Sequence, residues 1–354
     1  WIPPTPSLIR DGNGTHDIHF QSDVERISAS WNEFFDAESD IVEYFYCIGS
    51  RPDFCNILNQ TSVGLDLRAQ AKVGLEHGRT YFVSVTAINS AGLSTTSSSN
   101  GVTIDTSPPV VQGFAITSGI VIDQNTTNES IPSDVTAILT NKCKISATWD
   151  EIFDEESEIK RVSICSTTNN EECDLFMWQD LNPDSSVFNF DFQHPLQSGT
   201  VLMLKLLVEN GAGLKTTVNS SKVIVDKSPP VKGFVKINSK SGLVFLREDQ
   251  PLIALWWDFN DFETGIKEYK WKVCSARRIP DCVTNFVSVG LKNSIALNDI
   301  EILHGKEYNF VVKAVNFAGL ETDSVSNSFI LDKTPPATGM VFNGLDSDKV
   351  KNYQ

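Results

Sequence analysis

The sequence lacks the features that mark most enzymes, nucleic-acid-binding proteins and membrane proteins. It has no Gly-rich phosphate loop, no nucleophile elbow and no zinc-binding helix motif, and its five histidines are scattered. No apolar run reaches the roughly 18 residues that cross a bilayer. No stretch of useful length follows the helical period of 3.6 residues. These absences predict an all-β chain that is not an enzyme and that reaches a membrane only through parts of the protein not present here.

Charge and size narrow the class further. The chain has 354 residues, 40% of them hydrophobic and 21% charged, which is a globular balance that suits two or three domains. Its formal net charge of −16 excludes nucleic acid as a partner, because phosphates would repel such a surface. The acidity suits a soluble extracellular protein, a cationic partner or bound calcium. The chain opens with Trp1 and Ile2 rather than a signal peptide, so we expect a mature or internal stretch.

Internal repetition predicts the domain organisation. A Pro-Pro pair recurs at intervals of roughly a hundred residues, the length of one β-sandwich. The pairs are Pro3-Pro4, Pro108-Pro109, Pro229-Pro230 and Pro335-Pro336. We predict three β-sandwich domains at residues 1–107, 108–228 and 229–334, and the start of a fourth repeat at 335–354.

The same landmarks return inside each repeat. They are a tryptophan (Trp31, Trp149, Trp256), an acidic turn (Asp36 with Glu38, Asp154 with Glu156, Asp261 with Glu263) and a late Asn-x-Ala-Gly-Leu turn that begins at Asn89, Asn210 or Asn316. Between them, aromatic and branched residues alternate with period two, which is typical of strands with one buried face.

Six of the seven cysteines form pairs at one spacing, Cys-x7-Cys. The pairs are Cys47 with Cys55, Cys165 with Cys173 and Cys274 with Cys282. Metal sites usually need tighter cysteine or histidine clusters. One disulfide per domain is therefore the better interpretation, and it implies an oxidising compartment. The third pair lies two residues later in its repeat, a shift that keeps the cysteines on the same outward strand face.

The landmarks together resemble the fibronectin type III family over essentially the whole chain. The early tryptophans are similar to the core tryptophan of that family. Tyr81 and Tyr308, each six residues after Leu75 and Ile302, are similar to its tyrosine corner. Two features depart from the pattern: Leu202 replaces the corner tyrosine in the second repeat, and the paired cysteines are not common in the family. The resemblance implies joined immunoglobulin-like sandwiches with adhesion, receptor or matrix roles.

The acidic turns are the candidate ion sites. In a fibronectin-type sandwich the acidic turn, the asparagine turn and the incoming linker lie at one pole, so carboxylates should gather at each domain junction. The candidate calcium ligands are Asp105, Asp154 and Glu156 at the first junction and Asp226, Asp261 and Glu263 at the second. Such oxygens are ligands that calcium accepts. The alternative is that the aspartates cap their own turns through local hydrogen bonds.

Five Asn-x-Ser/Thr sequons become candidate glycosylation sites once the chain is placed in the secretory route. They are Asn13, Asn59, Asn125, Asn128 and Asn219, and none falls in the third repeat. Cys143 is the odd cysteine. It is either a buried free thiol or a bridge to another chain.

These observations predict an extracellular or cell-surface segment that acts as a structural and adhesive rod of a larger matrix, fibre or cell-surface protein. Short Pro-Pro linkers should limit bending between neighbouring domains, and repetition should add weak contacts by avidity. Its partners would be other proteins or copies of itself. The alternative is a receptor ectodomain that binds a ligand at one junction, which an exposed apolar patch on a single domain would favour. An enzyme with accessory sandwich domains is a third alternative.

Overall fold

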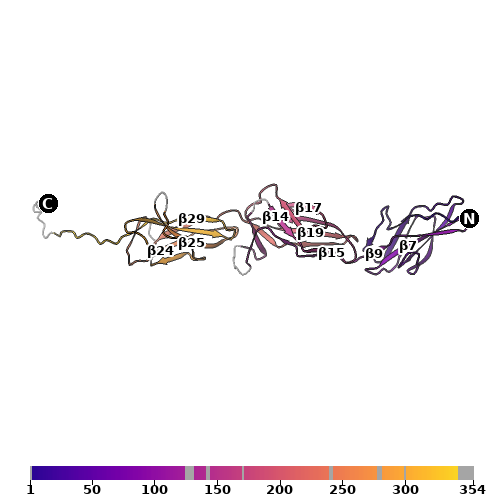
Figure 1. The fold of residues 1–354 in the computed structure, drawn as a ribbon, viewed down its shortest axis with the longest axis horizontal. Helices are drawn as coiled ribbons and strands as arrows, with labels where there is room; N and C mark the ends of the chain where they lie inside the picture. Colours follow the sequence, from indigo (N-terminus) through magenta and orange to yellow (C-terminus); the bar gives the residue numbers. More distant parts are fainter. Residues whose placement is uncertain are drawn as a thin grey trace. The chain divides into compact units, whose positions relative to one another are not determined.

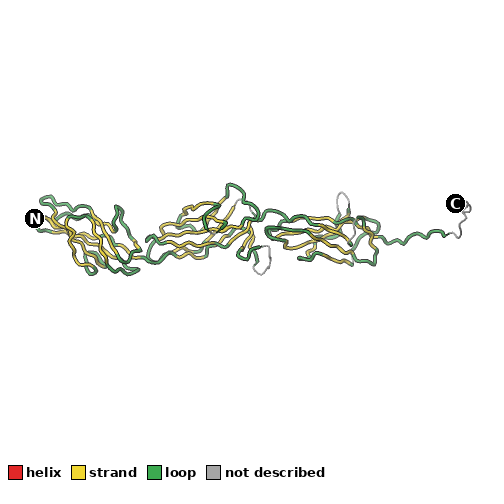
Figure 2. Tube along the Cα trace, turned by 180° about the vertical axis from the view of Figure 1, so that it is seen from behind, coloured by secondary structure: helices red, strands yellow, loops and turns green. Residues whose placement is uncertain are grey.

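The computed structural model describes residues 2–123, 131–140, 144–169, 171–238, 242–276, 281–298 and 300–341. Every regular element in these ranges is a β-strand (Figure 2), which confirms the predicted all-β class. The ranges contain no helix that could span a membrane. The chain divides into two compact units between Asp226 and Lys227. The first unit holds two hydrophobic cores and the second unit holds one.

The first sandwich consists of two sheets. One has the order β1-β3-β6, and the other has the order β2-β9-β7-β4-β5 with β8 paired to β7. Figure 1 labels β7 and β9, which are neighbours in the larger sheet. Their bounds are β1 (Ile9–Asp11), β2 (Phe20–Gln21), β3 (Arg26–Trp31), β4 (Ile41–Gly49), β5 (Leu58–Gly64), β6 (Arg68–Lys72), β7 (Thr80–Asn89), β8 (Ser94–Ser98) and β9 (Val102–Ile104). All pairings are antiparallel except that of β2 with β9.

The second sandwich repeats this plan with additional short strands. Its smaller sheet has the order β11-β14-β18, and its larger sheet has the order β12-β13-β21-β19-β16-β17 with β20 paired to β19. Their bounds are β11 (Ala115–Ile116), β12 (Ile120–Val121), β13 (Val135–Leu139), β14 (Lys144–Thr148), β16 (Ile159–Thr167), β17 (Phe176–Leu181), β18 (Val187–Asp191), β19 (Val201–Asn210), β20 (Lys215–Asn219) and β21 (Lys222–Val225). A separate pair joins β10 (Val110–Gln112) to β15 (Glu151–Phe153).

The third sandwich has the same two sheets as the first. The orders are β22-β24-β27 and β23-β30-β28-β25-β26, with β29 paired to β28. Their bounds are β22 (Phe234–Ile237), β23 (Val244–Leu246), β24 (Leu252–Trp257), β25 (Ile266–Ser275), β26 (Val287–Ser288), β27 (Ser294–Leu297), β28 (Glu307–Asn316), β29 (Glu321–Val325) and β30 (Phe329–Leu331).

The shared strand order defines the chain as a tandem array of fibronectin type III-like β-sandwiches. The predicted domain borders stay a prediction, although the division after Asp226 falls within two residues of the predicted border at 228. Residues 335–341 of the predicted fourth repeat contain no strand, and residues 342–354 lie outside the described residues.

Strand alternation and the core tryptophans build each core as predicted. In β3, Ile27, Ala29 and Trp31 are buried, whereas Ser28 and Ser30 between them are only partly buried. The tryptophans pack on aromatic neighbours, for example Trp31 on Tyr44 with ring centroids 6.0 Å apart.

The tyrosine corners are confirmed. Tyr81 is buried, and its hydroxyl accepts the Glu76 N–H at 3.0 Å. Tyr308 accepts the Leu303 N–H in the same way at 3.1 Å. Leu202 takes the equivalent place in the second core without a polar atom and is also buried.

One core position of the first sandwich holds an aspartate. Asp11 pairs with the alanine two residues before the core tryptophan, a position that Ile116 and Ile237 occupy in the other sandwiches. Its side chain is fully buried, and Oδ2 accepts the Gly101 N–H at 3.0 Å. Oδ1 has no hydrogen-bond partner among the described residues. Burial raises the pKa of Asp11 from 3.8 to about 7, and the nearby charge of Asp17 adds to the rise, while His19 opposes it.

We predict that Asp11→Asn removes a pH dependence of the first sandwich. A pKa raised in the folded state means that the stability from this group is present below about pH 4 and is lost as pH rises through about 7. Asparagine keeps an acceptor for Gly101 and does not titrate. The wild type should lose stability as the pH rises, whereas the variant should not. The Tm of the variant minus that of the wild type should therefore increase by several degrees between pH 5 and 8. Calorimetry with exposed Asp66→Asn as the control measures it, and a difference that is constant with pH would contradict the burial argument.

Candidate functional site

The acidic turn and the asparagine turn of each sandwich are joined by one asparagine side chain. In the second sandwich Asn210 Nδ2 donates to Asp154 Oδ2 at 3.0 Å, while Asn210 Oδ1 accepts the Leu214 N–H at 2.8 Å. The equivalent Nδ2 bonds are 2.9 Å from Asn89 to Asp36 and 3.0 Å from Asn316 to Asp261. The two landmarks that repeat in the sequence are thus two halves of one contact.

The aspartates also cap their own turns. Asp154 Oδ1 accepts the N–H groups of Glu156 and Ser157, at 3.2 and 2.9 Å. Burial favours the neutral form of Asp154, but the Asn210 amide and these turn donors outweigh it and lower the pKa of that carboxyl. In the first sandwich, the Asn89 amide likewise lowers the pKa of Asp36. The geometry is that of the Asx turn, the alternative to calcium.

The linker aspartate Asp105 joins the first sandwich to the second. Its side chain is fully buried, and Oδ2 accepts from Ser157 Oγ at 2.6 Å and from Asn210 Nδ2 at 2.8 Å. Oδ1 accepts the Ser107 N–H at 3.0 Å, and the Asp105 N–H donates back to Gln21 of the first sandwich. A buried charge with this many donors holds the linker against both sandwiches.

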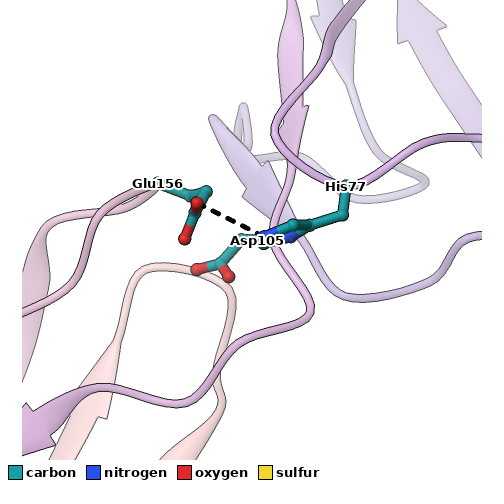
Figure 3. Close-up of side chains that lie close together, drawn as sticks. All are labelled: His77, Asp105 and Glu156. Atoms are coloured by element: carbon teal, nitrogen blue, oxygen red, sulfur yellow. Dashed lines mark ion pairs between the residues drawn. The ribbon is translucent and has the colours of Figure 1, made fainter.

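A histidine of the first sandwich completes the junction. His77 Nε2 lies 3.3 Å from Glu156 Oε1 of the second sandwich (Figure 3). Its Nδ1 accepts the Thr106 N–H at 3.1 Å, so the proton of the neutral ring lies on Nε2 and faces Glu156. One ligand atom from each of His77, Asp105 and Glu156 lies within 4.8 Å of the others.

From the sequence, His77 counted only among five scattered histidines, and this role was missed. The signal in the sequence that could have identified this role was the recurrence of a histidine, His304, at the equivalent place in the third repeat. His304 Nδ1 accepts the Lys333 N–H across the same separation of 29 residues that joins His77 to Thr106.

The junction has more acceptor oxygens than protons to share. Ser107 Oγ lies 3.1 Å from Asp105 Oδ1 and 2.8 Å from Glu156 Oε2. Ser157 Oγ likewise reaches both Asp105 and Asp154. Because each hydroxyl has one proton, one carboxylate in each set lacks that donor at any moment. This surplus of acceptor oxygens is the feature that makes the junction a candidate site.

Packing also brings the first two sandwiches together. A Cβ built on Gly211 would lie 2.7 Å from a ring carbon of Phe20, so a larger residue here would force the Phe20 ring to shift. The equivalent positions of the other repeats hold Ser90 and Phe317. A threonine also fixes each of the first three Pro-Pro segments: the hydroxyls of Thr95, Thr216 and Thr322 donate to the carbonyls of Pro4, Pro109 and Pro230.

The residues predicted for the second junction are divided between the two compact units. Asp226 ends the first unit, and its N–H donates to the Leu139 carbonyl of that unit at 3.0 Å. In the second unit, Asp261 Oδ1 accepts the N–H groups of Thr264 and Gly265, and Glu263 accepts from Ser228 Oγ at 2.7 Å. Asp261 therefore also caps its own turn.

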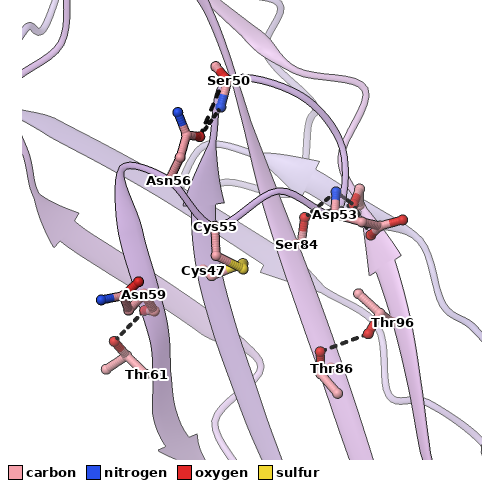
Figure 4. The surroundings of a disulfide bond; sticks show 11 residues. Cys47, Ser50, Asp53, Cys55, Asn56, Asn59, Thr61, Ser84, Thr86 and Thr96 are labelled. Atoms are coloured by element: carbon pink, nitrogen blue, oxygen red, sulfur yellow. Dashed lines mark hydrogen bonds between the residues drawn. A yellow bond between two sulfur atoms is a disulfide. The ribbon is translucent and has the colours of Figure 1, made fainter.

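Each predicted cysteine pair forms a disulfide within its own sandwich. Cys47 and Cys274 alternate with the core residues of their strands, as predicted, whereas Cys165 belongs to the hydrophobic core of its sandwich, and all three cysteines are buried. In the first sandwich the Asp53 N–H lies within hydrogen-bond distance of Ser84 Oγ, at 3.0 Å, on the neighbouring strand (Figure 4).

The glycosylation sites stay predictions. Asn13, Asn59 and Asn219 are exposed, whereas Asn125 and Asn128 lie outside the described residues. Cys143 also lies outside them. Within the described residues, His16 and His19 are not part of a metal-like cluster.

Comparison with known proteins adds little. No family model and no curated protein matches the chain. The FN1–FN3 domains of chicken CNTN1 are 16% identical over 92% of this chain and 99% of that chain, with a TM-score of 0.25. The fibronectin(III)-like modules of Clostridium thermocellum CbhA are 13% identical over 62% and 94%, with a TM-score of 0.36. A Ca²⁺-stabilized adhesin of an ice-binding Antarctic bacterium is 12% identical over 95% and 76%, with a TM-score of 0.40. With every TM-score below 0.5, the fold class depends on the strand order of the chain itself.

Calcium at the first junction stays a prediction. Carboxylate oxygens are suitable calcium ligands. Oxygens of Asp105 and Glu156, however, already face the donor groups of Asn210, Ser157 and His77, whereas calcium needs six to eight oxygen ligands. If calcium binds, chelation should lower the Tm of the wild-type chain and leave that of Glu156→Gln unchanged. Unfolding curves of the wild type that coincide in EDTA and in millimolar calcium would contradict it.

Proposed function

We propose that the chain is a structural and adhesive segment of an extracellular or cell-surface protein, acting through protein–protein contacts. The observation that supports this most is the first junction. Its linker aspartate is fully buried and bonded by side chains of the following sandwich. A flexible tether between independent domains has no need of such contacts. They favour a segment that keeps its domains in a defined succession.

Two further observations support an extracellular, non-enzymatic role. Each sandwich carries one disulfide, and such bonds persist in oxidising compartments. The candidate ligand clusters within the described residues are the acidic sets already placed at the turns and linkers. These sets cap turns and tether a linker, and they contain no nucleophile paired with a base.

The proposal predicts that Asn210→Ala weakens the chain more than Asn89→Ala does. Both changes remove an asparagine that bridges its own turns, but only Asn210 also donates to the linker aspartate. Loss of a donor to a buried carboxylate costs about 1–3 kcal/mol. We expect that difference in denaturant unfolding, together with a broader distribution of interdomain distances in small-angle scattering.

Asn89→Ala is the matched control because Asn89 makes the same turn contacts without a linker carboxylate. Equal effects of the two changes, with unchanged scattering, would mean that the junction does not hold the domains. Scattering from the wild-type chain as a compact globule would also contradict the proposed succession.

A further inference from the structure

The third sandwich carries an apolar outer face that its sister sandwiches lack. The inward side chains of β22, β24 and β27 form the core, so their neighbours point outward. The outward set includes Phe234, Ile253 and Trp257, which are 60%, 39% and 39% exposed. The only charged side chain on these three strands is Lys236. We call this surface, defined by Phe234, Lys236, Ile253, Leu255, Trp257 and Ala296, the β22-β24-β27 face.

Strand register gathers these side chains into one patch. Phe234 pairs with Trp257 across β22 and β24, and their rings stack with centroids 5.9 Å apart. Ile253 pairs with Ala296 across β24 and β27. Lys236 Nζ lies 5.6 Å from the Trp257 ring, so its charge is directed at the indole.

Most of the same sheet positions are polar in the other two sandwiches, although Leu8 takes the place of Phe234 in the first and Ala115 takes the place of Lys236 in the second. The first sheet presents Arg10, Ser28 and Ser30 outward, and the second presents Ser146, Thr148 and Asn189. The residue after the core tryptophan, Trp257 here, is Asn32 in the first sandwich and Asp150 in the second. The fold therefore does not require an aromatic at this position.

Charge indicates what covers the face. The formal net charge is −7 for residues 1–107, −9 for 108–228 and 0 for 229–334, so the acidity of the chain lies in its first two repeats. Two copies of those repeats repel each other, whereas two copies of the third have no net charge to oppose contact. The third repeat also lacks a sequon, so no N-linked sugar would shield its face.

We infer that the β22-β24-β27 face binds the same face of a second copy of this chain. The contact is isologous: Phe234 and Trp257 of each copy pack against the partner's sheet. This inference deepens the proposed adhesive role by naming one partner.

The size of the patch sets the strength of the contact. Its exposed apolar area is on the order of 300 Å², at the lower edge of the largest patches on monomers. A stable interface buries about 800 Å² per partner. A single pair of faces should therefore associate weakly, with a Kd in the micromolar range or above, and would gain strength in a longer array by avidity.

Sedimentation velocity of the whole chain over a range of concentrations up to about 0.5 mM tests the inference. We expect concentration-dependent association that Trp257→Asn weakens about tenfold or more, as the loss of a central tryptophan does at other interfaces. Asparagine is the residue that the first sandwich carries at this position, so the variant should fold. Trp178→Asn is the matched control, because Trp178 of the second sandwich is also 39% exposed. It should leave association unchanged.

A cysteine at the face locates the contact independently. Ala296→Cys should form a disulfide-linked dimer on mild oxidation, and Trp257→Asn should slow that reaction. Every chain in this experiment also carries Cys143→Ser, so that the odd cysteine cannot link copies.

Three results would overturn the inference. They are a wild-type chain that stays monomeric up to 0.5 mM, an equal effect of the two tryptophan changes, and association that weakens with salt as an ion-paired contact does. Another protein or a glycan bound at this face of a monomeric chain would overturn it as well. None of these outcomes would alter the comparison of Asn210→Ala with Asn89→Ala, so failure here is distinguishable from failure of the proposed function.

Discussion

The bridge made by one asparagine side chain is the interaction on which the organisation of the chain depends. Asn210 uses its carbonyl oxygen to close its own turn and its amide to hold the acidic turn of the same sandwich. The same amide reaches Asp105, which belongs to the linker. Local turn chemistry and the attachment of the preceding domain therefore depend on the same few atoms. A junction built this way needs few residues beyond those of the repeat, because the asparagine and the acidic turn are already present in each sandwich.

The junction also shows how hydrogen-bond donors meet carboxylates that are buried close together. Asp105 and Asp154 accept hydrogen bonds from side chains and from backbone N–H groups. For Asp154 these donors outweigh the effect of burial and lower the pKa of the carboxyl. Glu156 is met by the ring proton of His77. Local turn bonds thus account for the geometry of the aspartates, while the excess of acceptors keeps calcium testable. The aspartate in the core, Asp11, has fewer donors, and burial there raises its pKa.

The three sandwiches share one scaffold and differ in what their outer faces present. In the first sandwich the disulfide loop lies against the outward face of the longer sheet, where the Asp53 N–H meets Ser84 Oγ (Figure 4). The shorter sheet is left open, and there the repeats diverge from arginine and serine to phenylalanine and tryptophan. Because buried positions determine the fold, the outward ones are free to specialise. The third repeat uses this freedom for an apolar face, and its net charge of zero matches that use.

The sequence by itself determined the features that depend on short-range order. Period-two alternation identified the strands. Recurrence along the chain identified the repeats, the cysteine pairs and the corner tyrosines, because each of these patterns lies within a short stretch of sequence. Only the tertiary structure decided the contacts between distant strands and between domains. Nothing in the local sequence marks Asp11 as a core residue, and only its register against β3 places it there. Nothing local marks His77 as a junction residue either, because its partner Glu156 comes from the next sandwich. The face around Trp257 is assembled from three strands that contribute only a few outward side chains each. Alternation along a strand is local information, whereas register and burial are set by the packing of the whole sandwich.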